Sequence, residues 1–327
     1  MRNFSYLRAT SAAEAGQAAQ QAGVMILAGG TTLLDLAKCG VSEPETVIDI
    51  THLSGMSGIA VDAAGARVGA LARMSEVADH KDIRAAFPAV SESLALAASA
   101  QLRNMATIGG NLLQRTRCPY FRDPGAFSAC NKRNPGSGCA AIGGVTRNHA
   151  VLGTSGSCIA SYPGDLAVAL VAFDAVVETD GRKVSVDDFF LAPSDTPDKE
   201  TVLQRGEMIT AITVPASAAA RNSTYIKVRD RQSYEFAAAS GAVGLELEAD
   251  GRTVRDIRVA IGGVATRPWR ARAVEQALVG KALDAELVDK ASRLAMEGAV
   301  AHGGNHYKIE LAPRVVARAI LKMGGLA

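Results

Sequence analysis

Short apolar runs alternate with helical patterns in the N-terminal part of the chain. Each run is too brief for a helix and stops at glycine or polar residues, which is typical of a buried strand. The predicted strands are residues 4–8, 24–27 and 46–50. After the first strand, Ser11 begins an Ala-rich helix, with Glu14 three residues on as in a capping box. A short helix is expected at 33–38, after a glycine turn at 28–32. The pattern predicts a compact β/α unit.

The middle of the chain combines hairpins with helices. Apolar runs joined by turn residues predict hairpins at 58–70 and 175–190, the second closed by Asp180-Gly181. Asp165 directly precedes an apolar run and is the type of residue that caps a helix N-terminus. The predicted helices are 74–80, 87–100 and 166–173, and a further strand is expected at 208–214.

The pattern changes after a linker at 215–222. Longer strands come first and helices follow, which is typical of an α+β domain with helices on one face of an antiparallel sheet. The predicted strands are 223–228, 237–248 and 254–261, and the predicted helices are 270–279, 285–301 and 313–323. We therefore expect one domain at 1–218 and a second at 222–327.

Composition narrows the class of protein. Hydrophobic residues make up 48% and charged residues 21%, which is ordinary for a globular chain. A formal charge of +2 provides no general attraction for nucleic acid, so a nucleic-acid partner is not expected. No apolar run reaches the roughly 18 residues that a membrane span needs, and the N-terminus has no signal-peptide pattern. Neither a membrane span nor an export signal of the chain's own is expected.

Two Gly-Gly turns are candidate phosphate-binding elements. The first is 28–32; the second joins Thr107, Gly109, Gly110 and Asn111. Glycines let backbone N–H groups approach a phosphate closely, and neighbouring hydroxyls add hydrogen bonds. Neither turn matches a Walker loop or a Rossmann fingerprint, and each alone is also typical of a purely structural connection. Together they would suit the two phosphates of one dinucleotide.

An irregular stretch from Thr107 to Asp165 holds four of the five cysteines. A compact protein seldom keeps so long an irregular segment without a use for it. The four are Cys118, Cys130, Cys139 and Cys158, separated by 11, 8 and 18 residues. No Cys-x-x-Cys pair is present, so the zinc-ribbon and thioredoxin patterns are absent.

Three interpretations of these cysteines stay open from spacing alone. Four thiolates match a [4Fe-4S] cluster, in which each iron takes one. A structural zinc site and four unrelated thiols are the alternatives, although exposed, unligated loop thiols oxidise readily. Cys39 lies far away in sequence and is interpreted as a structural thiol. His302 and His306 flank a glycine loop, where solvated or helix-capping histidines are commoner than metal ligands.

Three motifs in order resemble the FAD-binding subunit of the molybdenum hydroxylases. They are LAGGTTLLDL at 27–36, TIGGNLL at 107–113 and PGDLAVALVAFDA at 163–175, and YKIELAPRVVARAI at 307–320 resembles the family's closing helix. The resemblance implies a two-lobed FAD-binding domain of the vanillyl-alcohol oxidase-like (PCMH) type, with lobe 1 at about 1–55 and lobe 2 at about 56–218. An insertion at 114–160 resembles that of the subfamily with an extra [4Fe-4S] cluster, known from periplasmic aldehyde oxidoreductases.

The resemblance also implies a set of cofactor-binding residues. It places lobe 1 residues around the FAD pyrophosphate, lobe 2 residues closing on it, and a C-terminal strand near the isoalloxazine. The implied FAD-binding residues are Leu27, Ala28, Gly29, Gly30, Thr31, Thr32, Leu33, Thr107, Gly109, Gly110, Asn111, Asp165 and Lys227, the last with Arg229 or Arg231. Cys118, Cys130, Cys139 and Cys158 would be the iron ligands. The run RQSYEFA departs from the family pattern, so the role of Tyr234 is not implied.

The function implied is electron transfer within a larger complex. A large subunit with the molybdenum cofactor would oxidise the substrate, a small subunit with [2Fe-2S] clusters would relay electrons, and FAD here would pass them to an external acceptor. The sequence accordingly shows no catalytic acid/base pair of its own. Two rival hypotheses are a stand-alone flavin oxidase or reductase of this fold and a zinc-stabilised interaction protein. The compartment is the cytoplasm, or the periplasm if a signal-bearing partner exports the folded complex.

Overall fold

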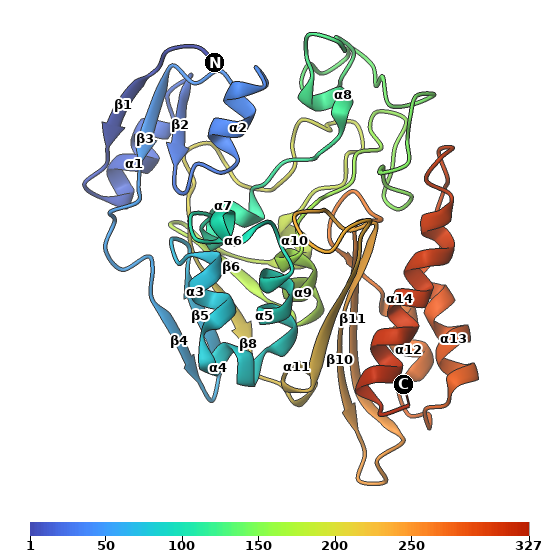
Figure 1. The fold of residues 1–327 in the computed structure, drawn as a ribbon. Coiled ribbons are helices and arrows are strands. Elements are labelled where there is room, and N and C mark those ends of the chain that lie inside the picture. Colours follow the sequence, from blue (N-terminus) through green and yellow to red (C-terminus); the bar gives the residue numbers. More distant parts are fainter. Residues whose placement is uncertain (327) are drawn as a thin grey trace.

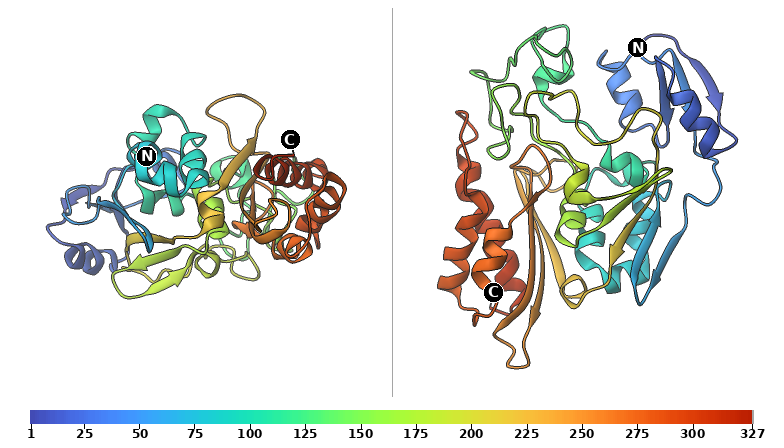
Figure 2. Two further views of the ribbon diagram at one scale, coloured as in Figure 1. Left: turned by 90° about the horizontal axis from the view of Figure 1, so that it is seen from below. Right: turned by 180° about the vertical axis from the view of Figure 1, so that it is seen from behind.

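The computed structural model describes residues 1–326 and contains three separate sheets (Figure 1). The first sheet belongs to the N-terminal lobe, the second to the middle of the chain and the third to the C-terminal domain. Views from below and behind show the C-terminal helices on the side of the molecule away from the N-terminal lobe (Figure 2). Within residues 1–326 no helix is both long and apolar enough to cross a membrane.

A parallel three-stranded sheet forms the N-terminal lobe. Its strands are β1 (Ser5–Arg8), β2 (Val24–Leu27) and β3 (Thr46–Asp49), in the order β1-β3-β2, with helices α1 (Ala12–Ala19) and α2 (Leu33–Lys38). Ser11 caps α1, because its Oγ accepts a hydrogen bond from the N–H of Glu14 at 3.1 Å. The reciprocal half of the expected capping box is displaced by one residue: the Glu14 carboxylate accepts from the N–H of Thr10.

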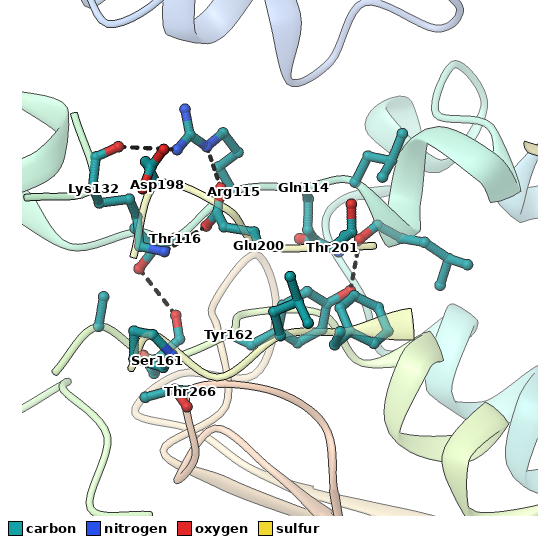
Figure 3. A pocket seen from close by; sticks show the side chains of 16 residues that line it. Gln114, Arg115, Thr116, Lys132, Ser161, Tyr162, Asp198, Glu200, Thr201 and Thr266 are labelled. Atoms are coloured by element: carbon teal, nitrogen blue, oxygen red, sulfur yellow. Dashed lines mark hydrogen bonds and ion pairs between the residues drawn. The ribbon is translucent and has the colours of Figure 1, made fainter. Parts of the chain in front are cut away.

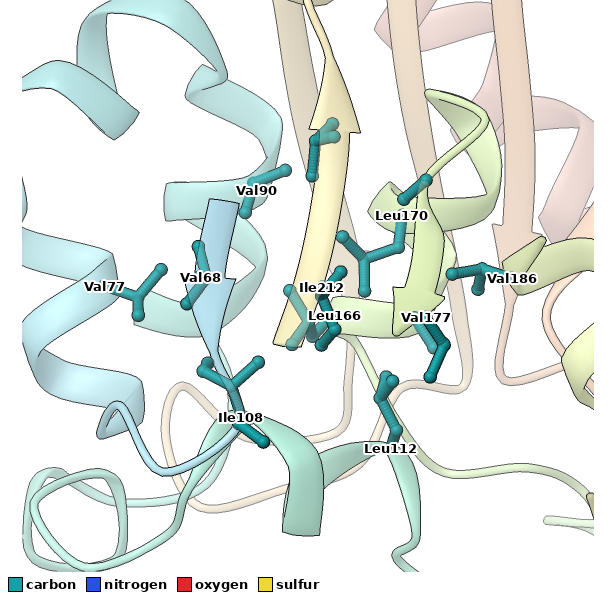
Figure 4. Close-up of a cluster of buried hydrophobic side chains, with 14 of the residues drawn as sticks. Val68, Val77, Val90, Ile108, Leu112, Leu166, Leu170, Val177, Val186 and Ile212 are labelled. Atoms are coloured by element: carbon teal, nitrogen blue, oxygen red, sulfur yellow. The ribbon is translucent and has the colours of Figure 1, made fainter. Parts of the chain in front are cut away.

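An antiparallel five-stranded sheet forms the second lobe. Its strands are β4 (Ile59–Asp62), β5 (Gly65–Gly69), β8 (Ile209–Pro215), β6 (Val176–Thr179) and β7 (Lys183–Ser185), in that spatial order. Around it lie α3 (Met74–Asp79), α4 (Lys81–Ala86), α5 (Pro88–Ala95), α6 (Ala100–Arg103), α7 (Ile108–Leu112), α9 (Leu166–Ala172) and α10 (Val186–Phe189). Val68, Ile108, Leu166 and Ile212 meet in its buried core (Figure 4).

The helix expected at 87–100 is interrupted, and α4 was not expected. Ala98 adopts a positive φ of 49°, which a helix cannot contain, and Ser99 then caps α6 by accepting from the N–H of Leu102. A single continuous helix was therefore a wrong prediction. Nothing in the run of alanines and serines signals that one alanine takes a left-handed conformation.

The insertion between the second glycine pair and α9 has one short helix, α8 (Pro119–Arg122), and little other regular structure. Tyr120 and Ile159 are buried in a small apolar cluster within the insertion, and Phe121 is buried in a second one that includes Leu36 of α2. The guanidinium of Arg133 donates to the carbonyl oxygens of Tyr120 and Phe121, each at 2.8 Å. These contacts show that packing and side-chain hydrogen bonds order much of the segment.

An antiparallel four-stranded sheet carries the C-terminal domain. Its strands are β9 (Ser223–Val228), β10 (Ala239–Leu247), β11 (Val254–Gly262) and β12 (Trp269–Arg270), in the spatial order β12-β11-β10-β9. The domain's own helices are α12 (Arg272–Leu278), α13 (Ala285–Arg293), the short η1 (Leu294–Met296) and α14 (Tyr307–Met323). They gather on one side of β10 and β11, as expected (Figure 1).

Three predictions in or near this domain were wrong in detail. The helix expected at 285–301 is shorter: α13 ends at Arg293 and η1 at Met296. The segment expected as a plain linker contains a helix, α11 (Ala218–Arg221), because Ser217 caps it and Ala219 and Ala220 are buried against β10. The helix expected to begin at Pro313 begins at Tyr307 instead. Pro313 is buried inside α14, so tertiary packing tolerates a proline that local rules place at a helix start.

Candidate functional site

The first glycine loop leaves its amides free. It follows β2 directly, and no backbone N–H from Gly29 to Leu33 donates a hydrogen bond to the described residues 1–326. Gly30 has a φ of 71°, a conformation that favours glycine. A Cβ on Gly29 would lie 2.1 Å from the carbonyl oxygen of Met105, so this glycine allows lobe 1 to touch lobe 2. Five successive free N–H groups create a polar edge suited to an anion.

The second glycine pair begins a helix and is not the turn that was expected. Thr107 is the N-cap of α7, and its Oγ1 accepts from the N–H of Gly110. The N–H of Gly109 donates to the carbonyl of Ala70 at 2.8 Å, and a Cβ on Gly109 would lie 2.9 Å from that of Ala70. Gly109 is therefore a packing residue, whereas Gly110 faces the space between the lobes.

A cavity of about 420 Å³ lies between the first glycine loop and the start of α7. Residues of both lobes line it, and most of its surface is apolar. Of the residues proposed for the cofactor, its lining includes Ala28, Gly29, Gly30, Thr31, Thr32, Leu33, Thr107, Gly109 and Gly110. Leu27 does not line it and packs behind the loop, within 3.2 Å of where a Cβ on Gly30 would be.

A second cavity of about 350 Å³ continues the first. Both are lined by Thr31, Thr32 and Gly110, so together they form one elongated cleft. Asn111 lines the second cavity, and its buried Oδ1 has no hydrogen-bond partner in the described chain. Buried polar atoms are nearly always paired, so this oxygen is suited to a bound group. Tyr234 also lines this cavity.

Asp165 does not cap α9. Its side chain makes no cap hydrogen bond; its Oδ2 accepts from Lys227 Nζ at 2.8 Å and its Oδ1 from Tyr225 Oη at 2.7 Å. Burial raises the pKa of the Asp165 carboxyl, and the Lys227 ammonium opposes that rise. The cap prediction was wrong because a tertiary ion pair takes the carboxylate.

Lys227 stands behind the cleft wall. Asp165 lines the second cavity, but Lys227 does not, and its side chain is only 1% exposed. Its Nζ also donates to the carbonyl of Leu96, as does Nη1 of Arg229. Of the arginines expected near the isoalloxazine, Arg231 lines the cavity and Arg229 does not. The ion pair thus joins β9 of the C-terminal domain to the second lobe.

A charged cluster joins the insertion to Glu200, in the loop after α10 (Figure 3). Glu200 accepts hydrogen bonds from Arg115 and, at 3.0 Å, from Lys132. Arg115 lines the elongated cleft, and Lys132 lines the cavity of the cysteines. Glu200 therefore connects the wall of the cleft to the wall of the cysteine cavity. Sequence inspection missed Glu200, which lies in a Pro/Asp/Ser-rich loop with no distinguishing motif.

All four cysteines of the insertion line one small cavity. Cys130 and Cys158 are buried, Cys118 and Cys139 are half-buried, and Cys130 and Cys139 form an isolated β-bridge. Burial raises the pKa of the Cys118 thiol to about 12 and raises that of Cys158 as well. Within residues 1–326, no three His, Cys, Asp or Glu side chains are grouped as a site for a single metal ion.

His149 is a buried residue that contacts Cys118, and no motif in the sequence pointed to it. Its Nε2 lies 3.2 Å from Sγ of Cys118. His302, by contrast, contacts the hydroxyl of Thr154, and His306 is exposed next to the carbonyl of Gly303. The only sequence signal for His149 was its place inside the cysteine-bearing stretch.

Two lobes that enclose an elongated cleft edged by free amides, followed by a sheet-and-helix domain, define a protein that holds a dinucleotide cofactor. The family model described as the FAD binding domain in molybdopterin dehydrogenase matches residues 2–217, and that of the CO dehydrogenase flavoprotein C-terminal domain matches residues 223–323. The chain belongs to the family of FAD-binding subunits of molybdenum hydroxylases. The resemblance, the fold class, FAD as a cofactor and the role of an oxidoreductase subunit are confirmed.

Individual relatives support this membership. The chain is 47% identical to the aldehyde oxidoreductase FAD-binding subunit PaoB of Escherichia coli, over 85% of this chain and 86% of that one. It is 28% identical to the glyceraldehyde dehydrogenase medium chain of Sulfolobus acidocaldarius, over 90% and 88%. A carbon monoxide dehydrogenase structure from Hydrogenophaga pseudoflava superposes with a TM-score of 0.76 and 25% identity, covering 100% of this chain and 99% of that one.

Proposed function

We propose that this chain is the electron-transfer subunit of an aldehyde-oxidising molybdenum hydroxylase. The name and high identity of the Escherichia coli relative support an aldehyde as the substrate class. The medium chains among the relatives support assembly with a large molybdenum-cofactor subunit and a small [2Fe-2S] subunit. FAD would supply the redox chemistry here, taking up electrons from the partners and passing them to an external acceptor.

The proposed FAD site is the elongated cleft between the lobes. The free N–H groups of Gly29 to Leu33 and the hydroxyls of Thr31 and Thr32 would hold the pyrophosphate, with Gly110 opposite. Asn111 Oδ1 would accept a hydrogen bond from the cofactor in the second cavity. Lys227 would not contact FAD itself but would hold the Asp165 carboxylate in place at the cleft wall. A division at 1–218 and 222–327, with lobes meeting near residue 55, agrees with the placement of the three sheets.

The four cysteines of the insertion are proposed as ligands of a [4Fe-4S] cluster. The observation that supports this is their arrangement around one cavity, although 11, 8 and 18 residues separate them in sequence. Thiolates on a single tetrahedral ion with bonds of about 2.3 Å must lie within about 4 Å of one another. A four-iron cluster takes one thiolate per iron, so its ligands surround a larger space.

The test is the cofactor content of the natively purified complex. We expect FAD, molybdenum, iron and acid-labile sulfide, with four more irons per FAD than the [2Fe-2S] clusters of the small subunit account for. Cys130→Ser should remove this extra iron and leave FAD bound, because the cysteine cavity and the FAD cleft are separate. Cys39→Ser is the matched control, since Cys39 is a free thiol outside that cavity.

Each part of the proposal has its own contradicting result. Zinc without extra iron would refute the cluster and leave the FAD site untouched. Purification without larger partners, together with bleaching of the flavin by substrate in the isolated chain, would refute the role of an electron-transfer subunit. Loss of FAD with iron retained in Cys130→Ser would contradict the separation of the two sites.

A further inference from the structure

His149 is held against Cys118 by contacts from two parts of the chain. Its Nε2 is 3.2 Å from the sulfur, and the ring is almost fully buried. The backbone N–H of His149 donates to the carbonyl of Thr146 at 2.9 Å. From the C-terminal domain, Asn305 Nδ2 donates to the carbonyl of Ala150 at 2.9 Å. Asn305 is fully buried, so the segment that carries the imidazole is fixed on both sides.

The contact geometry sets one nitrogen of the imidazole, Nε2, against the sulfur. A neutral imidazole carries one N–H and one lone pair. Its Nδ1 has no partner in residues 1–326, whereas Nε2 faces sulfur. When Cys118 is a thiolate it can only accept, so the proton belongs on Nε2.

We propose that His149 donates its Nε2–H to Sγ of Cys118 and thereby raises the reduction potential of the cluster that the four cysteines would hold. This inference rests on the proposed function of those cysteines. Hydrogen bonds to the sulfurs are one of the factors that set a cluster's potential. Reduction adds one electron and one negative charge to the cluster, and a donor on a ligand sulfur stabilises the more negative state. His149 keeps its proton throughout and is a positioning residue that touches a ligand.

The test uses the natively purified complex and compares four proteins: wild type, His149→Leu, His149→Gln and His52→Leu. Leucine removes the donor at similar volume, whereas glutamine retains an N–H. His52 is exposed in the first lobe and is the matched control. Iron and FAD contents are measured first. The midpoint potential of the [4Fe-4S] signal is then followed by electron paramagnetic resonance during a dithionite titration.

We expect the midpoint potential to fall in His149→Leu, to return towards the wild-type value in His149→Gln and to stay unchanged in His52→Leu. An unchanged potential in His149→Leu with full iron content would overturn the inference. Equal lowering in the leucine and glutamine variants would also overturn it, because the change would then follow ring removal and not the donor. Absence of the extra iron in the wild type would instead refute the proposed function.

A measurement on the wild type keeps the inference testable if His149→Leu loses its cluster. In protein with nitrogen-15-labelled histidine, the reduced cluster should show a weak nitrogen coupling and a proton coupling that disappears in D₂O. A strong nitrogen coupling would mean that His149 binds iron directly, which contradicts the donor role. The absence of both couplings would contradict it as well.

Discussion

Replacing Lys227 by methionine should destabilise the chain strongly. Lys227 and Asp165 are 1% and 5% exposed, and their charged atoms are 2.8 Å apart. Methionine retains the length of the side chain and removes the ammonium. Tyr225 then remains the only hydrogen-bond donor to the Asp165 carboxylate in the described residues, and a buried negative charge is left without its counter-charge.

The expected loss is about 3–5 kcal/mol, the usual cost of removing one partner from a buried ion pair. The double variant Lys227→Met with Asp165→Asn should recover most of it, because a neutral amide can still accept from Tyr225 and carries no charge to bury. Lys183→Met is the control. Lys183 pairs with Glu178 at 3.2 Å, but its side chain is 71% exposed, so its loss should cost roughly 0–1 kcal/mol.

The destabilisation should also depend on pH in a definite direction. Burial already raises the pKa of Asp165, and removing Lys227 removes the largest opposing influence, so the folded-state pKa rises further. In the unfolded chain the carboxyl titrates at about 3.9. The cost of Lys227→Met is therefore fully present above the raised folded-state pKa. It shrinks as the pH falls from that value towards the unfolded one.

Urea unfolding at fixed FAD concentration measures these effects, since bound ligand adds to stability. Trp269 is the single tryptophan and lies in β12, so its fluorescence reports the C-terminal domain, while far-ultraviolet circular dichroism reports the whole chain. If Lys227→Met cost no more than Lys183→Met, or if adding Asp165→Asn made it worse, the ion pair would not be a major link between the two parts of the chain.

Three further predictions concern the lobe contact, an acid-sensitive pair and the charged cluster. Gly29→Ala places a Cβ 2.1 Å from the carbonyl oxygen of Met105 and should weaken FAD binding roughly tenfold or more (about 1.4 kcal/mol). Titration of flavin-free protein with FAD measures this. Gly58→Ala, which has open space around its Cβ, should leave FAD binding unchanged. Hydrogen bonding from Arg182 lowers the pKa of Glu207 to about 2. The ionised carboxylate therefore stabilises the fold above the ordinary glutamate pKa, and this stabilisation disappears as the pH falls towards 2. Urea midpoints of the wild type should fall across this range, and those of Glu207→Gln should not show that fall. Glu200→Gln removes the charge that Arg115 and Lys132 share and should speed tryptic cleavage of the insertion, which limited proteolysis would detect; an unchanged rate would contradict the link.

Local signals explain what the sequence could predict. The loop after β2 was recognisable because an apolar run, two glycines and two threonines follow one another within a few residues, and α2 begins where the run resumes. The hairpins β4–β5 and β6–β7 were recognisable for the same reason, because their periodicity and their turn residues lie close together. The second was expected to reach residue 190 but ends at Ser185, where α10 follows. Cofactor roles for these residues stay predictions, because they depend on a group that binds between segments.

Tertiary contacts explain what the sequence did not reveal. Asp165 has the local context of a helix cap, but its partner Lys227 is 62 residues away, and the buried ion pair outweighs a cap on α9. His149 reaches Cys118 across 31 residues, and no periodicity records that approach. Ala98 takes a left-handed conformation two residues after Leu96, whose carbonyl oxygen accepts hydrogen bonds from Lys227 and Arg229 of the C-terminal domain. The partners of Asp165, His149 and Leu96 all lie on segments far away in the sequence.

The base of the insertion explains how so long an irregular segment can exist inside this fold. Thr116 Oγ1 donates to the carbonyl of Ser161 at 3.0 Å, and Tyr162 Oη donates to that of Leu112 at 3.2 Å. These bonds bring the two ends together next to the cleft, although 45 and 50 residues separate the partners. The chain therefore leaves and re-enters the FAD-binding lobe at nearly one point, and lengthening a closed loop costs little additional entropy. The cysteines gather around a cavity that shares no lining residue with the cleft of the glycine loop, which is why loss of the cluster and loss of FAD should be separable.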